Sequence, residues 1–195
     1  MSGKFGQASN TRKSVEWYSP QWIFHELGLQ FDLDPCSPHD MQTAVPARVK
    51  YTIFDNGLTS PWFGLVWLNP PYGPDVSLWM QAMLSHNNGV ALVFSRTDAT
   101  WFQQAMRAAQ TTLFLSGRIA FVPGHENRHK KSRAGAGTAL FGFGNEAATG
   151  VRRLAHRGVL FDRPANPPPH TAAIRRSMQT TLPFYELNRG HSCTH

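Results

Sequence analysis

The segment LVWLNPPYG, residues 65–73, combines residue types that could activate a weakly nucleophilic amine. An amine on an aromatic ring is a poor nucleophile, because its lone pair is delocalised into the ring. The Asn69 carboxamide oxygen and the Pro70 carbonyl oxygen can both accept hydrogen bonds from such an amine, which favours a tetrahedral nitrogen. Pro70 and Pro71 each fix φ and hold these acceptors still, while Tyr72 offers a face on which an extruded nucleobase can stack.

A second Asn-Pro-Pro, at residues 166–168, provides an internal comparison. It follows Arg-Pro-Ala instead of an apolar run, and Pro169 stands where the first copy has its tyrosine. Three residues alone therefore carry little meaning, and a rigid turn is the alternative interpretation. The buried strand before Asn69 and the aromatic ring after it favour a functional site.

Hydrophobic periodicity places the segment in a sheet flanked by helices. Ser19 is expected to cap a first helix, with Pro20 at its first position and Gly28 at its end. Asp98 is expected to cap a later helix. The predicted strands are residues 30–34, a short strand that ends near Asp55, and residues 65–69, 89–95, 111–115, 118–122 and 138–144. Strands that alternate with helices and are followed by consecutive strands predict an α/β fold, mostly parallel, with an antiparallel C-terminal hairpin.

The 195 residues predict one folded domain at 16–162 between two tails. Residues 1–15 are expected to be a flexible tail, and 163–195 a Pro-rich, weakly ordered one. No apolar run is long enough to cross a membrane and no signal peptide is visible, which predicts a cytoplasmic protein. Two cysteines fit neither a disulfide framework nor a four-ligand zinc site. His125 and His129 are interpreted as solvated loop residues, so no metal site is predicted.

Positive charge is concentrated in one segment of a chain whose net charge is +7. Residues 118–133 carry five basic residues against Glu126 alone. This segment is predicted to contain a long loop between two strands, where basic side chains contact phosphates. A solvated loop tip is the alternative. The predicted DNA contacts are Arg128, Lys130, Lys131 and Arg133.

Several blocks together resemble the small phage-type DNA N6-adenine methyltransferase family, whose members use S-adenosylmethionine. The blocks are WYSPQWIFHELGLQFDLDPC, DNGLTSPWFGLVWLNPPYG, FSRTDATWF and SGRIAF, and the resemblance runs from about residue 17 to 144. It implies a Rossmann-like class I methyltransferase sheet and methyl transfer to the amino group of adenine in DNA. It also implies that the protein is located in the cytoplasm of a bacterial or phage-infected host cell.

The resemblance also implies site residues. Asn69, Pro70, Pro71 and Tyr72 would be catalytic and would hold the base. The implied cofactor contacts fall in three blocks: Tyr18, Ser19 and Pro20 near the methionine part, Asp34, Pro35 and Cys36 at its ammonium, and Asp55 and Leu58 near the adenosine. The segment after Asp34 lacks the glycine-rich loop that many methyltransferases have. The alternative to a cofactor contact is therefore that Asp34 only caps a turn.

Two other functions remain open from the sequence. One is methylation of another planar amine, such as guanine in RNA or glutamine in a protein. The other is a non-catalytic DNA-binding protein built on a methyltransferase scaffold, an alternative that the missing glycine-rich loop supports. An intact Asn-Pro-Pro-Tyr argues against the second, because a binder has no need of the paired acceptors.

Overall fold

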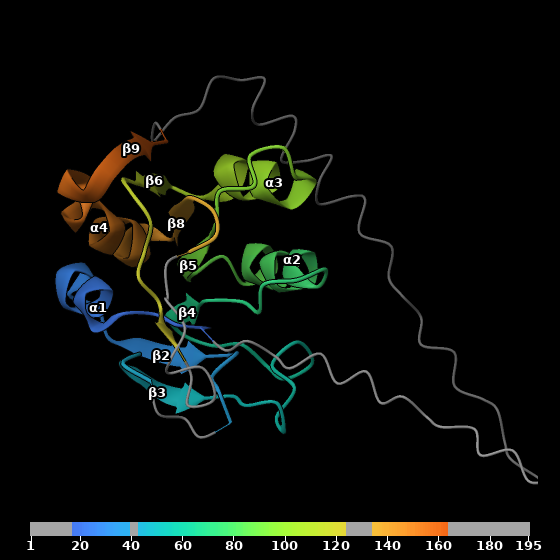
Figure 1. Cartoon of the computed structure of the whole chain (residues 1–195). Helices are drawn as coiled ribbons and strands as arrows, with labels where there is room; N and C mark the ends of the chain where they lie inside the picture. Colours follow the sequence, from blue (N-terminus) through green and yellow to red (C-terminus); the bar gives the residue numbers. More distant parts are fainter. Residues whose placement is uncertain (1–16, 40–42, 124–133, 164–195) are drawn as a thin grey trace, which may run out of the picture. The chain divides into compact units, whose positions relative to one another are not determined.

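One mixed sheet with helices on both faces organises the chain (Figure 1). A computed structural model describes residues 17–39, 43–123 and 134–163. Within these ranges seven strands form the sheet, in the order β3-β2-β4-β5-β8-β6-β9, and β1 and β7 form a separate two-stranded sheet. The predicted DNA contacts Arg128, Lys130, Lys131 and Arg133 lie outside the described residues, as do most residues of both predicted tails.

Strands and helices alternate along part of the chain, as the pattern predicts, and elsewhere strands follow one another without a helix between them. The strands are β1 Trp17–Tyr18, β2 Phe31–Asp34, β3 Ala47–Lys50, β4 Val66–Leu68, β5 Gly89–Phe94, β6 Thr111–Leu115, β7 Val122–Pro123, β8 Thr138–Phe143 and β9 Gly158–Asp162. The helices are α1 Gln21–Leu27, α2 Val76–His86, α3 Thr100–Ala108, α4 Asn145–Arg153 and the short 3₁₀ helix η2 Ala155–Arg157. None of the helices in the described ranges is long and apolar enough to span a membrane.

The sheet has a parallel half and an antiparallel half. The β3–β2, β2–β4 and β4–β5 pairs are parallel, and the β5–β8, β8–β6 and β6–β9 pairs are antiparallel. The expected α/β class is confirmed. The antiparallel part is larger than the expected hairpin, because β8 is inserted between β5 and β6 and β9 adds an edge strand.

Alternating side chains of β4 divide the core into two layers. Trp67 packs with α1 and α4 on one face, whereas Val66 and Leu68 pack with α2 and α3 on the other. Successive side chains of a strand point to opposite faces, so a strand buried on both faces is apolar throughout, as β4 is. Figure 1 shows the same division, with α1 and α4 on one side of the sheet.

Four local predictions are wrong. The strand expected at residues 118–122 is reduced to the two residues of β7, which starts at Val122 and pairs with β1 outside the main sheet. The strand expected to end near Asp55 is a turn, because the Asp55 carboxylate accepts hydrogen bonds from the Thr52 N–H at 2.7 Å and the Thr52 hydroxyl at 2.9 Å. Pro20, not Ser19, occupies the N-cap position of α1. Ala99, not Asp98, precedes α3, with no side-chain cap.

Candidate active site

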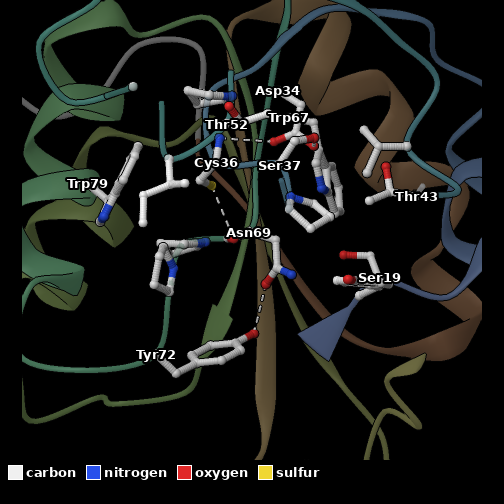
Figure 2. A pocket seen from close by; sticks show the side chains of 18 of the residues that line it. Ser19, Asp34, Cys36, Ser37, Thr43, Thr52, Trp67, Asn69, Tyr72 and Trp79 are labelled. Atoms are coloured by element: carbon white, nitrogen blue, oxygen red, sulfur yellow. Dashed lines mark hydrogen bonds between the residues drawn. The ribbon is translucent and has the colours of Figure 1, made fainter. Parts of the chain in front are cut away.

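A cavity of about 530 Å³ opens at the carboxyl ends of β2 and β4 (Figure 2). Asp34 is the last residue of β2, and Asn69 directly follows β4. Ligand sites in open α/β sheets usually lie at this edge, and the volume falls within the range of small-molecule pockets. The edge therefore brings a carboxylate and a carboxamide to one cavity from positions 35 residues apart.

Most of the predicted site residues lie on the wall of this cavity. They are Tyr18, Ser19, Asp34, Pro35, Cys36, Asn69, Pro70, Pro71 and Tyr72. Pro20, Asp55 and Leu58 do not line it. Pro20 is buried at the start of α1, and Leu58 packs against the core beneath α2 and α3. The Asp55 carboxylate is exposed and its hydrogen bonds to Thr52 lower its pKa.

Asp34 is a buried carboxylate that also shapes the turn after β2. Its side chain is 3% exposed, and it accepts hydrogen bonds from the Ser37 hydroxyl at 2.7 Å and the Cys36 N–H at 3.2 Å. The turn-cap alternative therefore describes the local geometry correctly. Burial raises the pKa of Asp34 to about 6, against the lowering effects of these hydrogen bonds and of Lys50. A cationic group brought into the cavity would favour the ionised form.

Cys36 links the acidic turn to the backbone of Asn69. Its thiol donates a hydrogen bond to the Asn69 carbonyl oxygen at 3.2 Å (Figure 2). Burial, and secondarily the charge of Asp34, raise the pKa of the thiol well above its usual value, so it stays a neutral donor. Pro70 contributes no N–H to this peptide bond. The thiol thus helps to orient the peptide that joins Asn69 to Pro70.

Tyr72 closes one side of the site and contacts the Asn69 side chain. Its hydroxyl donates to Asn69 Oδ1 at 3.0 Å. Its ring stacks on Phe94, with centroids 3.8 Å apart and planes at 15°, and meets Phe121 edge-on. Burial raises the pKa of the phenol, which keeps it a donor. A carboxamide oxygen has two lone pairs and can accept two hydrogen bonds. The Phe94 ring covers one face of the Tyr72 ring.

Several cavity residues were missed by the sequence analysis. They are Ser37, Pro38, Thr43, Val45, Thr52, Ile53, Asn56, Gly57, Trp67, Gly73, Pro74, Asp75 and Trp79. Two had a readable signal. Ser37 follows Asp34 at the spacing of a side-chain turn bond. Gly57 follows Asn56 in a turn signal, and a Cβ at Gly57 would lie 1.9 Å from the Pro35 carbonyl oxygen, so the loop packs against the acidic turn only with glycine there.

Comparison with known protein families gives the decisive observation. Residues 8–149 match the family described as DNA N-6-adenine-methyltransferase (Dam). The chain belongs to this family. The family match covers the whole cavity wall and all the predicted catalytic and cofactor-binding residues. Comparisons with curated proteins and with solved structures give no match.

The family assignment agrees with the chemistry of the cavity wall. The wall combines the acceptors of Asn69 and Pro70, a stacked aromatic ring and a buried carboxylate. Among the described residues, no group of three His, Cys, Asp or Glu side chains is placed to hold a metal ion. The predicted contacts with DNA, at Arg128, Lys130, Lys131 and Arg133, fall outside the described residues.

Proposed function

We propose that this protein is an S-adenosylmethionine-dependent methyltransferase that acts on the N6 amino group of adenine in DNA. The observation that carries the proposal is one cavity shared by the acidic turn at Asp34 and the Asn-Pro-Pro-Tyr segment. A methyl donor and an acceptor amine have to meet in one place, and this cavity offers groups suited to each. The family to which the chain belongs supports DNA adenine as the acceptor.

The cavity wall fits the cofactor on one specific point. S-adenosylmethionine, when bound, supplies a methyl group carried on a sulfonium centre, and its amino acid end bears an ammonium. Asp34 is a buried carboxylate at the cavity whose pKa burial raises to about 6, so a cationic partner would relieve the cost of its ionisation. Asp34 and the neighbouring Pro35 and Cys36 would hold the amino acid end, and Tyr18 and Ser19 would border it.

The acceptor side of the proposal rests on Asn69 and its neighbours. Adenine would be flipped from the DNA, and its amine would donate to Asn69 Oδ1 and to the Pro70 carbonyl. Both acceptors draw the nitrogen lone pair out of the ring and aim it at the methyl group. The base would stack on the face of the Tyr72 ring opposite Phe94. The Tyr72 hydroxyl would keep the Asn69 carboxamide oriented.

A competition between acceptors tests this proposal against its rivals. Equal amounts of adenine-containing DNA, RNA and a glutamine-rich protein would be incubated with the enzyme and tritiated S-adenosylmethionine. We expect label in the DNA only. Label in RNA or protein would favour the planar-amine alternative, and no label together with no calorimetric heat of cofactor binding would favour a non-catalytic DNA-binding protein.

Cys36 gives a prediction about the link between the two halves of the site. Cys36→Ala removes the donor to the Asn69 carbonyl and should lower kcat roughly 3- to 10-fold, because a neutral hydrogen bond contributes about 1 kcal/mol. Cys36→Ser keeps a hydroxyl donor and should stay closer to the parent. Steady-state kinetics with thermal unfolding as the control measures both. Equal kcat values for the two variants would show that the hydrogen bond to the Asn69 carbonyl does not contribute to catalysis.

The basic loop gives a prediction about DNA. Neutralising Lys130, Lys131 and Arg133 together should weaken DNA binding and flatten the plot of log affinity against log salt by up to about 3 units, roughly 0.9 per lost phosphate contact. Fluorescence anisotropy at several salt concentrations measures this. Neutralising Arg107, an exposed residue of α3, is the control and should leave the slope unchanged. An unaltered slope in the triple variant would exclude the loop.

Another basic cluster is less suited to DNA, because its side chains are engaged within the protein. Arg152 pairs with Asp162 at 2.9 Å, and Arg153 donates to the carbonyls of Leu27 and Gly28 at the end of α1. Arg157 binds the Glu26 carboxylate and lies over the Trp22 ring. These contacts tie α4 and η2 to α1 or to β9. They leave the predicted loop as the stronger candidate for phosphate contacts.

A further inference from the structure

Ser19 and Trp67 each place a buried polar atom without a hydrogen-bond partner at the same cavity. Ser19 Oγ and Trp67 Nε1 have no partner, their residues are 3% and 0% exposed, and both residues line the cavity wall. Across the described ranges one other buried side-chain atom, Thr138 Oγ1, lacks a partner, and Thr138 does not line the cavity. Buried polar groups normally find partners, so two exceptions on one wall point to a missing ligand.

The chemistry of the missing partner follows from the donor types. An indole N–H donates and never accepts, so the partner of Trp67 has to be an acceptor. The indole is packed against Phe24 and Phe31, with ring centroids 4.7 and 5.6 Å away, which fixes the direction of its N–H. The Ser19 hydroxyl rotates and can donate to the same group. An acceptor with two oxygens would satisfy both.

Asp34 supplies the complementary charge on the same part of the wall. Figure 2 shows Asp34, Trp67 and Ser19 on one side of Asn69 and Trp79 on the other. Trp67 belongs to the α1 and α4 layer and Trp79 to the α2 and α3 layer, which agrees with this separation. A buried carboxylate beside two unpaired donors matches a zwitterion, with its ammonium at Asp34 and its carboxylate at the donors.

We infer that Trp67 Nε1 and Ser19 Oγ bind the α-carboxylate of the methionyl group of S-adenosylmethionine. The inference rests on the proposed function, because it names the contacts of the cofactor in the same cavity. It also accounts for Ser19 at a position where a helix cap was expected and no cap bond is found. Both donor atoms lie buried in the cavity wall.

A matched pair of ligands tests the inference without any turnover. Calorimetry would compare S-adenosylmethionine with its decarboxylated form, which lacks only the α-carboxylate. Trp67→Phe should weaken binding of the complete cofactor roughly 10- to 100-fold, as expected for a lost hydrogen bond to a charged group. The same variant should bind the decarboxylated form within twofold of the parent. Ser19→Ala should show the same selectivity.

Two control variants separate the donor role from general damage. Thr138→Val removes the third unpaired buried hydroxyl, away from the cavity, and should change the affinity for neither ligand. Trp79→Phe removes an indole from the other side of the cavity and should affect both ligands equally. Thermal unfolding checks the fold, and Ser19→Ala carries the test should Trp67→Phe fail to fold.

The outcomes distinguish the inference from the proposed function. The parent protein could bind both ligands, and Trp67→Phe and Ser19→Ala could lose equal affinity for each. That result would overturn the inference alone and indicate that water satisfies the donors. Parent protein that binds neither ligand would overturn the proposed function and the inference with it. Selective loss of the carboxylate-bearing ligand in the two variants supports both.

Discussion

Asn69→Ala should lower kcat for methyl transfer to adenine by roughly 10²- to 10³-fold, the range found when one preorganised hydrogen-bonding group is removed from an active site. The substitution removes the carboxamide that would accept from the amine, and it leaves the Asn69 carbonyl, which accepts from Cys36, in place. Cofactor affinity should therefore change little. Single-turnover kinetics with labelled cofactor measures the chemical step, and calorimetry measures the cofactor affinity.

Three further variants sharpen this prediction. Asn166→Ala alters the second Asn-Pro-Pro, which follows Arg-Pro-Ala and has Pro169 in place of the tyrosine, and should behave as the parent. Asn69→Asp keeps an acceptor oxygen and should retain more activity than the alanine variant. Tyr72→Phe removes the hydroxyl that orients the carboxamide and should cost less than Asn69→Ala. An Asn69→Ala enzyme as fast as the parent would show that the carboxamide has no catalytic role.

The second large effect is expected for Asp34→Asn, which should lower cofactor affinity and raise stability to unfolding. Asp34→Asn removes the charge proposed to hold the cofactor ammonium, and cofactor affinity should fall roughly 10- to 100-fold. The same change removes a buried carboxylate. Its amide can still accept from the Cys36 N–H and can donate to the Ser37 hydroxyl, so the turn after β2 keeps its bonds.

The stability part follows from the raised pKa of Asp34. Because the folded-state pKa is about 6 and the unfolded value is 3.8, the folded protein binds more protons between these values. The free energy of unfolding therefore falls as pH rises through this window, by about 3 kcal/mol for a shift of about two units, and stays lower above it. At pH 8, Asp34→Asn should unfold at a higher temperature than the parent.

The pH dependence of binding runs the other way. A cationic ligand needs the ionised carboxylate, so cofactor affinity in the parent should drop about tenfold per pH unit below pH 6. Asp34→Asn should abolish this dependence. Asp32→Asn, two residues earlier in β2 and outside the cavity wall, is the control. A parent affinity that is constant from pH 4.5 to 8 would contradict the assignment of the ammonium to Asp34.

The parts of the site that were predictable are those with a local signal. The apolar run before Asn69 indicates a buried strand, and the rule that ligands bind at the carboxyl ends of strands places Asn69 at a cavity edge. Asp34 ends the neighbouring strand by the same reasoning. Tyr51, Thr52, Ile53 and Phe54 are good strand formers, yet the bonds from Thr52 to Asp55 close a turn instead.

The contacts that join the site were not predictable, because they depend on packing between distant residues. The thiol of Cys36 reaches a carbonyl 33 positions away, and the indole N–H of Trp67 is aimed by Phe24 and Phe31 from other elements. Ser19 has the residue type of a helix cap, yet Pro20 occupies the N-cap position of α1 and the Ser19 hydroxyl has no hydrogen-bond partner. No spacing rule describes such contacts.

Nucleoside analysis of treated DNA tests the central claim most directly. Unmethylated DNA would be incubated with the protein and with S-adenosylmethionine that carries a deuterated methyl group. The DNA would then be digested to nucleosides and analysed by mass spectrometry. Asn69→Ala serves as the low-activity comparison and Asn166→Ala as the matched control. The proposal predicts deuteriomethyl-labelled N6-methyldeoxyadenosine, strongly reduced in Asn69→Ala alone. Unmodified deoxyadenosine from DNA treated with a protein that binds the cofactor, or label on another nucleoside, would contradict it.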